Sequence, residues 1–339
     1  MKANQHSRLS IAPMMDWTDR HCRYLHRLMS RHVRLYTEMV ASAALVRGNA
    51  RHLIAFDDSE HPLALQLGGS DPSELADAAR IAATEGFDEV NLNVGCPSDR
   101  VQSGTFGAVL MKNPDLVAEC LAAMRSAVTV PVTVKCRIGV DDQDPAVVLP
   151  DFLRHVRDAG VTTVAIHARK AWLQGLSPKQ NREVPPLDHD LVCAMKDRFP
   201  DLRIILNGGI ASLDQAHALL GRGVDGIMVG RAAYQSPWRI LGMADREIFG
   251  KNPPFSSPAE VVRAMCPYIE RHLGDGGRLH AVTRHMLGLF AGRTGARRWR
   301  RTLSERVRDD GAGVGVVVEA LEAVVQSSGD GDVHFGKAA

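Results

Sequence analysis

The chain has 339 residues, of which 45% are hydrophobic and 24% charged, and its formal net charge is only +2. This ordinary globular composition fits one large domain of about 250 residues and a smaller one. No apolar run reaches the roughly 18 residues of a membrane-spanning helix, and the polar N-terminus lacks the apolar core of a signal peptide. Six cysteines without CxxC spacing predict neither a disulfide framework nor a metal site, so we expect a cytoplasmic protein.

Eight short aliphatic runs predict eight strands, with helix signals between them. The predicted strands are 9–14, 34–40, 63–68, 89–94, 131–138, 162–168, 203–207 and 226–230. Asp71 before Pro72, and Asn113 before Pro114, are typical helix starts. The strands do not alternate strictly, as is usual when both faces of a parallel sheet are covered. Eight repeats favour a closed (β/α)8 TIM barrel over a doubly wound sheet, because no GxGxxG follows the first strand.

The C-terminal part has a different pattern. Pro, Gly and Ser gather in residues 246–258, which we interpret as a linker. Apolar residues then recur at helical spacing, and they predict helices that open at Ser257, pass through 282–290 and end with 313–326. We therefore expect a barrel over 1–245, a small C-terminal helical bundle over 259–326, and a disordered tail over 327–339.

Residues 91–98 end the fourth predicted strand on a cysteine. Gly95 permits a sharp turn and Pro97 fixes the φ that follows, so we expect the Cys96 thiol at the C-terminal mouth of the strand. Barrel enzymes carry out their chemistry at that face. The alternative is a small buried residue, the usual state of an intracellular cysteine. The setting favours a functional thiol.

Polar groups end most of the other predicted strands. Alone, each fits a solvated strand end or a structural group, but a barrel would gather them into one pocket. They include Gln66, Asn93, Lys135, Arg137, His167 and Arg169. Glycines follow the last two strands, at 207–209 and 230–231, where this fold commonly binds phosphate; ordinary turns are the alternative. Together these features describe a cofactor with a phosphate tail and a polar ring system.

A basic cluster lies near the C-terminus. Arg293–Arg301 holds five arginines in nine residues and no acid, with Trp299 among them. Arginine binds phosphate bidentately and stacks on bases, so we interpret the cluster as an RNA-binding surface. A solvated helix face is the alternative.

Nine motifs, in this order along nearly the whole chain, carry a resemblance to a known family. They are residues 12–20, 65–69, 91–98, 133–139, 166–169, 175–182, 206–210, 228–231 and 284–290. In these motifs the sequence resembles the tRNA-dihydrouridine synthases, most closely the A-type subfamily. The resemblance implies bound FMN, NADPH as the reductant, and reduction of the C5–C6 bond of uridines 20 and 20a in the tRNA D-loop.

The resemblance also implies roles for residues. Hydride passes from reduced flavin to uracil C6, and C5 needs a proton, which Cys96 would supply because a thiol of pKa about 8.5 is protonated at neutral pH. Lys135 would favour the anionic reduced flavin by Coulomb attraction. The flavin contacts implied are Pro13, Met14, Met15, Gln66, Lys135 and His167 for the ring, and Asn207, Gly208, Gly209, Gly230 and Arg231 for the phosphate end.

The target base must leave its stack to reach the flavin. The RNA contacts expected are Asn93 and Arg169 around the flipped base, and Lys179, Arg182, Arg293, Arg297 and Arg298 elsewhere on the tRNA. We expect the loop with Gly104 and Gly107 to close over substrate, and the protein to be a monomer without a metal ion.

Two other functions fit parts of the sequence. A small-molecule flavin reductase of the dihydroorotate or dihydropyrimidine type would share the barrel and the FMN, but it needs no arginine cluster. An RNA-binding protein with an idle barrel would not need Cys96, Lys135 and His167 together.

Overall fold

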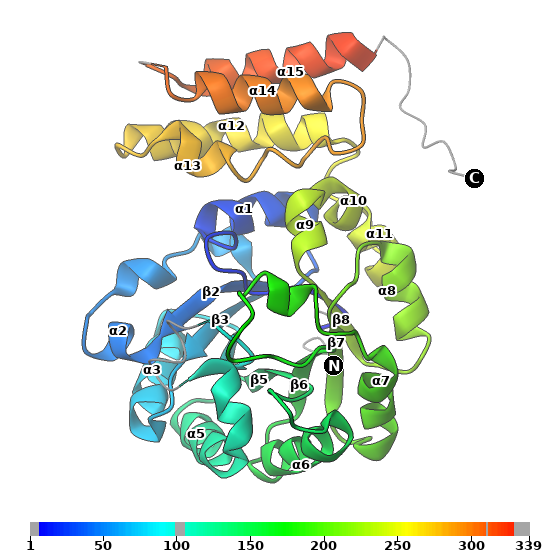
Figure 1. The fold of residues 1–339 in the computed structure, drawn as a ribbon. Coiled ribbons are helices and arrows are strands. Elements are labelled where there is room, and N and C mark those ends of the chain that lie inside the picture. Colours follow the sequence, from blue (N-terminus) through cyan, green and yellow to red (C-terminus); the bar gives the residue numbers. More distant parts are fainter. Residues whose placement is uncertain (1–6, 99–105, 310, 329–339) are drawn as a thin grey trace. The chain divides into compact units, whose positions relative to one another are not determined.

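The computed structural model describes residues 7–98, 106–309 and 311–328. Its strands form one parallel sheet in the order β1-β8-β7-β6-β5-β4-β3-β2 (Figure 1). The strands are β1 (Leu9–Ile11), β2 (Leu35–Ala41), β3 (Leu63–Gly68), β4 (Glu89–Val94), β5 (Val132–Arg137), β6 (Thr163–His167), β7 (Arg203–Asn207) and β8 (Gly226–Val229). A bridge from Ser10 to Arg34 joins β1 to β2 and closes the sheet. The predicted (β/α)8 barrel is confirmed, although its first strand ends at Ile11.

Helices follow the strands, and several begin where the sequence predicts. Asp71 accepts a hydrogen bond from Glu74 N, and Asn113 accepts one from Leu116 N, so both cap their helices. The α-helices of this part are α1 (Arg20–Met29), α2 (Ser42–Val46), α3 (Pro72–Thr84), α5 (Pro114–Ala127), α6 (Pro145–Asp158), α7 (His189–Arg198) and α8 (Leu213–Leu220). Short 3-10 helices are η2 (Arg51–Ile54), η3 (Asp58–Glu60), η4 (Gly107–Lys112) and η5 (Gln180–Arg182).

The chain divides into two compact units, and the division differs from the expected one at residue 245. The first unit comprises Met1–Arg23 and His32–Gly230, and the second comprises Tyr24–Arg31 and Arg231–Ala339. Within the second unit, the Asp245 carboxylate accepts from Ser30 Oγ at 2.5 Å and from Arg31 N at 2.9 Å. These bonds explain why residues after β8 group with the later turns of α1. The first four residues of the expected linker belong to α11 (Ala244–Phe249).

The second unit is helical around a buried tryptophan. The Trp299 indole donates to Met286 O at 2.9 Å and meets the Phe290 ring edge-on at 4.9 Å. The predicted helix through 282–290 is wrong, because α13 ends at Thr283 and turns follow. A Cβ on Gly288 would lie 2.5 Å from Gln235 O, so glycine lets the two backbones pack closely at this turn. The other helices are α9 (Arg231–Gln235), α10 (Pro237–Leu241), α12 (Pro258–Gly274), α13 (Leu279–Thr283), α14 (Ala296–Arg306) and α15 (Val314–Ser328).

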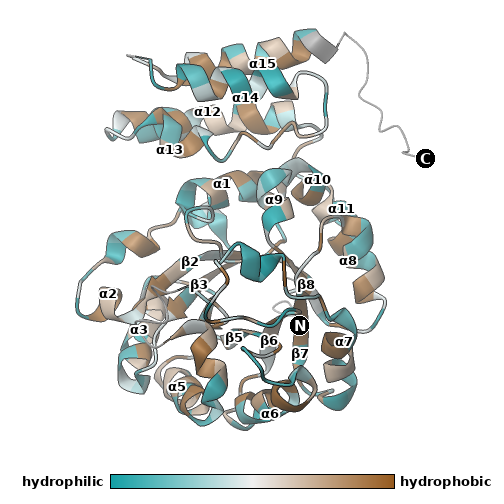
Figure 2. Ribbon diagram, in the orientation of Figure 1, coloured by the Kyte–Doolittle hydropathy of each residue, from teal (hydrophilic) through white to brown (hydrophobic). Residues whose placement is uncertain are grey.

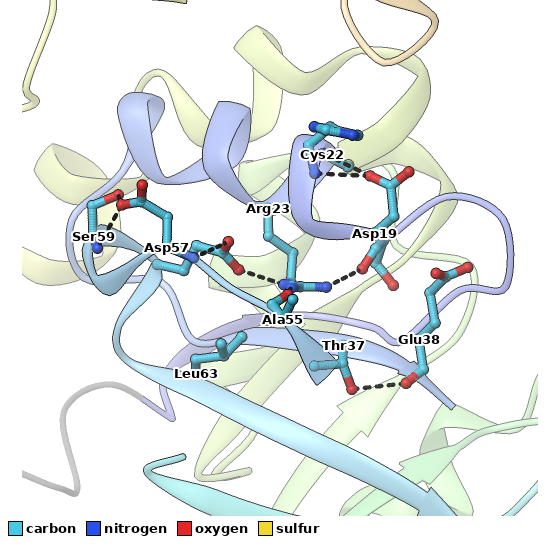
Figure 3. Close-up of polar contacts among 12 residues, drawn as sticks. Asp19, Cys22, Arg23, Thr37, Glu38, Ala55, Asp57, Ser59 and Leu63 are labelled. Carbon is cyan, nitrogen blue, oxygen red and sulfur yellow. Dashed lines mark hydrogen bonds and ion pairs between the residues drawn. The ribbon is translucent and has the colours of Figure 1, made fainter. Parts of the chain in front are cut away.

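The segment that follows β1 is held in place by buried polar contacts (Figure 3). Asp19 caps α1 by accepting from His21 N at 2.9 Å and Cys22 N at 3.0 Å. The buried Arg23 guanidinium donates to the Glu60 carboxylate at 2.5 Å and to Thr18 O at 2.8 Å. A buried ion pair with further hydrogen bonds holds one geometry. The turn after β1, which carries Met14 and Met15, is thereby fixed to η3.

Candidate active site

The turn after β4 presents the Cys96 thiol. Asn93 Oδ1 accepts from Gly95 N and from Cys96 N, both at 3.0 Å, and Cys96 O accepts from Ala108 N at 2.9 Å. The thiol lies 3.4 Å from Ser98 Oγ and is partly exposed. An asparagine that binds the backbone two and three residues ahead fixes a tight turn. Cys96 therefore stands at the strand mouth, as the sequence predicts.

A buried chain of hydrogen bonds runs from this turn into the barrel. Asn93 Nδ2 donates to Gln66 Oε1, Gln66 Nε2 to Asn91 Oδ1, and Asn91 Nδ2 to Thr133 Oγ1, each at 2.8 Å. The Thr133 hydroxyl then donates to Glu89 Oε1 at 2.7 Å. Backbone N–H groups only donate and a carboxylate only accepts, so the two ends impose one direction on every amide between them.

This direction limits what Asn93 offers to a ligand. Its oxygen already accepts two backbone N–H groups, and one of its amide protons goes to Gln66. One N–H remains, so Asn93 is only a donor toward a ligand, whereas Gln66 retains one N–H and one lone pair. Such a pair suits the carbonyl edge of a pyrimidine ring.

Cations surround His167 at the same face of the barrel. Burial, and then Arg137, Lys135, Arg169 and Arg182, lower the pKa of His167 well below 6.5, so the imidazole is neutral at pH 7. Burial, and then Arg137, lower the pKa of Lys135 to about 8. Among the described residues the Lys135 ammonium has no hydrogen-bond partner. The site therefore favours an anionic ligand.

Arg137 ties three loops together. Its buried guanidinium donates from Nε to Gly95 O at 3.0 Å, and from Nη1 to Lys170 O at 2.8 Å and Asn181 O at 2.9 Å. Burial lowers the pKa of Arg137 to about 10, which leaves it charged at neutral pH. From sequence, Arg137 was only a polar strand end. Its partners are backbone carbonyls, and those leave no mark in a sequence.

The glycines after β7 and β8 lie close to neighbouring side chains. Gly208 has φ 116°, and a Cβ there would lie 2.9 Å from His167 Cδ2. Gly209 has φ 73°, and its Cβ would lie 2.4 Å from Leu187. A Cβ on Gly230 would lie 3.7 Å from Met14 Sδ. The positive φ and the close contacts with His167 and Leu187 therefore require glycine at 208 and 209.

The structure places the other predicted flavin contacts as follows. Pro13 is partly exposed and Met15 exposed in the turn after β1. Asn207 is buried and donates from Nδ2 to Met228 O at 2.7 Å. Arg231 directly follows Gly230 in the chain and begins α9 in the second unit.

The predicted RNA contacts fall on both units. Lys179 and Arg182 are exposed on the connection between β6 and α7, where Arg169 also lies and donates to Pro185 O. In the second unit, Arg297 and Arg298 are exposed on α14, whereas Arg293 is half-buried over the Trp238 ring at 5.9 Å. Trp299 is fully buried and does not belong to that surface. Its indole needs both an apolar site and an acceptor, and the bundle supplies them.

Some expectations concern features outside the site. Residues 99–105, including Gly104, lie outside the described residues, and Gly107 opens η4. Within residues 7–98, 106–309 and 311–328, no three His, Cys, Asp or Glu side chains gather as metal ligands would. In the same part of the chain, every helix is too short or too polar to cross a membrane.

Comparison with known proteins identifies the family. The dihydrouridine synthase (Dus) family model matches residues 10–327. A protein of Salmonella typhimurium named tRNA-dihydrouridine(20/20a) synthase is 58% identical over 94% of this chain and 95% of its own. Proteins of the same name from Escherichia coli K12 and Vibrio parahaemolyticus are 57% and 54% identical over 94% of this chain, and over 91% and 97% of theirs. The chain therefore belongs to the dihydrouridine synthase family.

Proposed function

We propose that this protein reduces the C5–C6 bond of uridines 20 and 20a in tRNA to 5,6-dihydrouridine, with FMN as its cofactor and NADPH as the reductant. The observation that carries the proposal is the Cys96 turn, held by Asn93, at the barrel face where Lys135, Arg137 and Arg169 surround His167. The names of the relatives support the same reaction and the same two uridines.

The residues at the barrel mouth fit a flavin nucleotide. Gln66 and Lys135 offer N–H groups and a positive charge to the pyrimidine edge of a flavin, and His167 lies against Gly208. Pro13, Met14 and Met15 offer apolar contact to the ring. The cradle of Asn207, Gly208, Gly209 and Gly230, with Arg231 next in the chain, suits a phosphate.

The chemistry divides between the cofactor and the chain. When bound and reduced, the flavin supplies a hydride to uracil C6. Cys96 donates the proton that uracil C5 receives, and water then reprotonates the resulting Cys96 thiolate. Asn93 donates its remaining N–H to a uracil carbonyl, and Arg169 adds positive charge beside it. Lys135 is charged at pH 7 and stabilises negative charge at the ring edge.

The tRNA requires a larger surface than the pocket. Lys179 and Arg182 on the first unit, and Arg293, Arg297 and Arg298 on the second, would bind its phosphates. We assign tRNA binding in the second unit to the helical bundle of residues 259–326. We also infer that the enzyme works in the cytoplasm, where tRNA is modified, and that it works as a monomer.

A direct assay tests the proposal. The purified protein should carry a flavin absorption spectrum and, with NADPH, convert uridines 20 and 20a of an unmodified tRNA transcript to dihydrouridine, located by mass spectrometry. Free uracil and orotate should remain unreduced. Reduction of the free pyrimidines with no effect on tRNA would instead support a small-molecule flavin reductase.

A further inference from the structure

An exposed tryptophan lies on the connection between β6 and α7. The Trp172 side chain is 36% exposed, whereas Trp238 and Trp299 are 3% and 0% exposed. Exposing an indole forgoes the burial of a large apolar surface, worth roughly 2 kcal/mol or more. Single exposed apolar residues are common, so exposure alone does not show a function.

The backbone around Trp172 is fixed on all sides. Asn181, itself fully buried, accepts from Trp172 N at 2.7 Å and donates to Trp172 O at 2.9 Å. The residue before, Ala171, forms a bridge with Val140, and the residue after, Leu173, donates its N–H to Asp141 at 2.8 Å. The indole is therefore presented from a rigid backbone, and ordering it on binding costs little.

This connection is joined to the catalytic turn. The Arg137 guanidinium that binds Gly95 O next to Cys96 also binds Lys170 O and Asn181 O. Figure 1 shows the segment after β6, in green, crossing the centre of the barrel in that view, and Figure 2 colours its short helix η5 as strongly hydrophilic. Trp172 thus belongs to the same face as the Cys96 thiol.

The surroundings of Trp172 identify the kind of partner. Lys170 Nζ lies 5.4 Å from the centroid of the indole ring, and Lys179 and Arg182 are exposed on the same connection. Val184 is also exposed on this connection, but residues 174–180 between it and Trp172 are mostly polar, whereas an apolar protein partner would need a continuous apolar patch. A flat aromatic ring beside cations matches a nucleobase and its phosphate.

We propose that Trp172 stacks on an unpaired base of the tRNA next to the target uridine, and that Lys170 binds the adjoining phosphate. This inference rests on the proposed function, because a base extruded from its stack leaves neighbours that need a new stacking partner. Trp172 acts on the affinity for tRNA and not on the chemical step.

The test compares two variants that differ in aromaticity. Trp172→Leu keeps an apolar side chain without a π face, and it should weaken binding of a fluorescein-labelled tRNA transcript roughly 5- to 100-fold. Trp172→Phe should bind within about threefold of the parent, because phenylalanine still stacks. At saturating tRNA both variants should form dihydrouridine at the parent rate. Val184→Ala removes another exposed apolar side chain (62% exposed) from the same connection and should leave tRNA binding unchanged.

Two results would overturn the inference. Parent-like binding by Trp172→Leu would mean that the indole does not touch tRNA, and equal losses in the leucine and phenylalanine variants would mean a packing role. The binding measurement needs no turnover. If the parent binds tRNA but makes no dihydrouridine, the proposed reaction fails while the stacking comparison still gives its own answer.

Discussion

The two sides of the barrel interior are built differently. On the side of β1, β6, β7 and β8, the interior holds Ala12, Ala165, Ile205 and Met228, which pack in one apolar cluster with Tyr36 of β2 and Ala64 of β3. On the side of β3, β4 and β5, it holds the hydrogen-bonded chain from Asn93 to Glu89. An apolar cluster tolerates exchanges that conserve volume, but a buried polar chain loses a partner with almost any exchange. The polar side therefore fixes the orientation of its side-chain amides, and the apolar side fills the interior.

The polar side ends at Cys96, where the largest effect is expected. Cys96→Ala should lower the rate of dihydrouridine formation by roughly 10²–10⁴, the usual contribution of a general acid, and leave flavin content unchanged. Quantifying dihydrouridine per tRNA over time checks this. Cys266→Ala, at a partly exposed cysteine of α12, is the matched control and should keep full activity. Equal rates in the two variants would remove Cys96 from the mechanism.

Interrupting the middle of the hydrogen-bonded chain should lower the stability of the fold. Asn91→Leu leaves Gln66 Nε2 without its acceptor and Thr133 Oγ1 without its donor, both buried. We expect about 2–6 kcal/mol of lost stability, because each of the two stranded polar groups costs about 1–3 kcal/mol. On the apolar side, Met228→Leu should cost less than about 1.5 kcal/mol. Urea unfolding measures the free energy of unfolding of both variants. Similar losses in the two would show that the polar and apolar sides tolerate substitution equally.

A smaller change separates orientation from stability. Thr133→Val removes two hydrogen bonds, one from Asn91 and one to Glu89, and should cost about 2 kcal/mol; Ile205→Val removes one methylene and should cost about 1 kcal/mol. Only Thr133→Val should slow turnover on tRNA, roughly severalfold, because the link from Asn91 to Glu89 is lost. Thr133→Ser should restore the rate. Equal turnover in both valine variants would show that the chain only stabilises the fold.

The smallest expected effect is a pH dependence at the rim of the polar side. The pKa of Lys135 is about 8, so its charge is lost as pH rises through that value. Flavin reduction by NADPH should fall a few-fold between pH 7 and 9 in the parent and stay flat in Lys135→Arg. Stopped-flow absorbance measures the rate.

Folding stability should move in the opposite direction. The pKa of Lys135 is lowered from 10.5 in the unfolded chain to about 8, so the unfolded state binds the extra proton between those values. The contribution of this group to stability therefore rises from about pH 8 to about pH 10.5. In Lys135→Met that part of the pH dependence should be missing from unfolding curves.

The sequence predicts the strands well because their signals are local. Seven of the eight lie within one residue of their expected bounds at both ends, and Gly95 and Pro97 place Cys96 correctly. The first strand ends three residues early, at Ile11, because a turn follows it. In this turn the Thr18 hydroxyl is hydrogen-bonded to the backbone N–H and C=O of Met14.

The polar chain is invisible in the sequence because it depends on register. Gln66 meets Asn91, and Asn91 meets Thr133, only because β3, β4 and β5 pair with those residues side by side. The burial of Trp299 and the grouping of Tyr24–Arg31 with the second unit likewise follow from packing between distant segments. Periodicity and capping motifs report none of these.

The single free N–H of Asn93 has a consequence for base choice. Uracil carries a keto oxygen at position 4, whereas cytosine carries an amino group there. An amide held as a donor forms a hydrogen bond with the keto oxygen of uracil. Toward the amino group of cytosine it faces a second donor, which leaves two buried N–H groups opposite each other. With the Asn93 N–H on position 4 of the base, the proposed site would refuse cytidine by hydrogen-bond polarity, and the carboxylate that sets this polarity, Glu89, lies four residues away at the opposite end of β4.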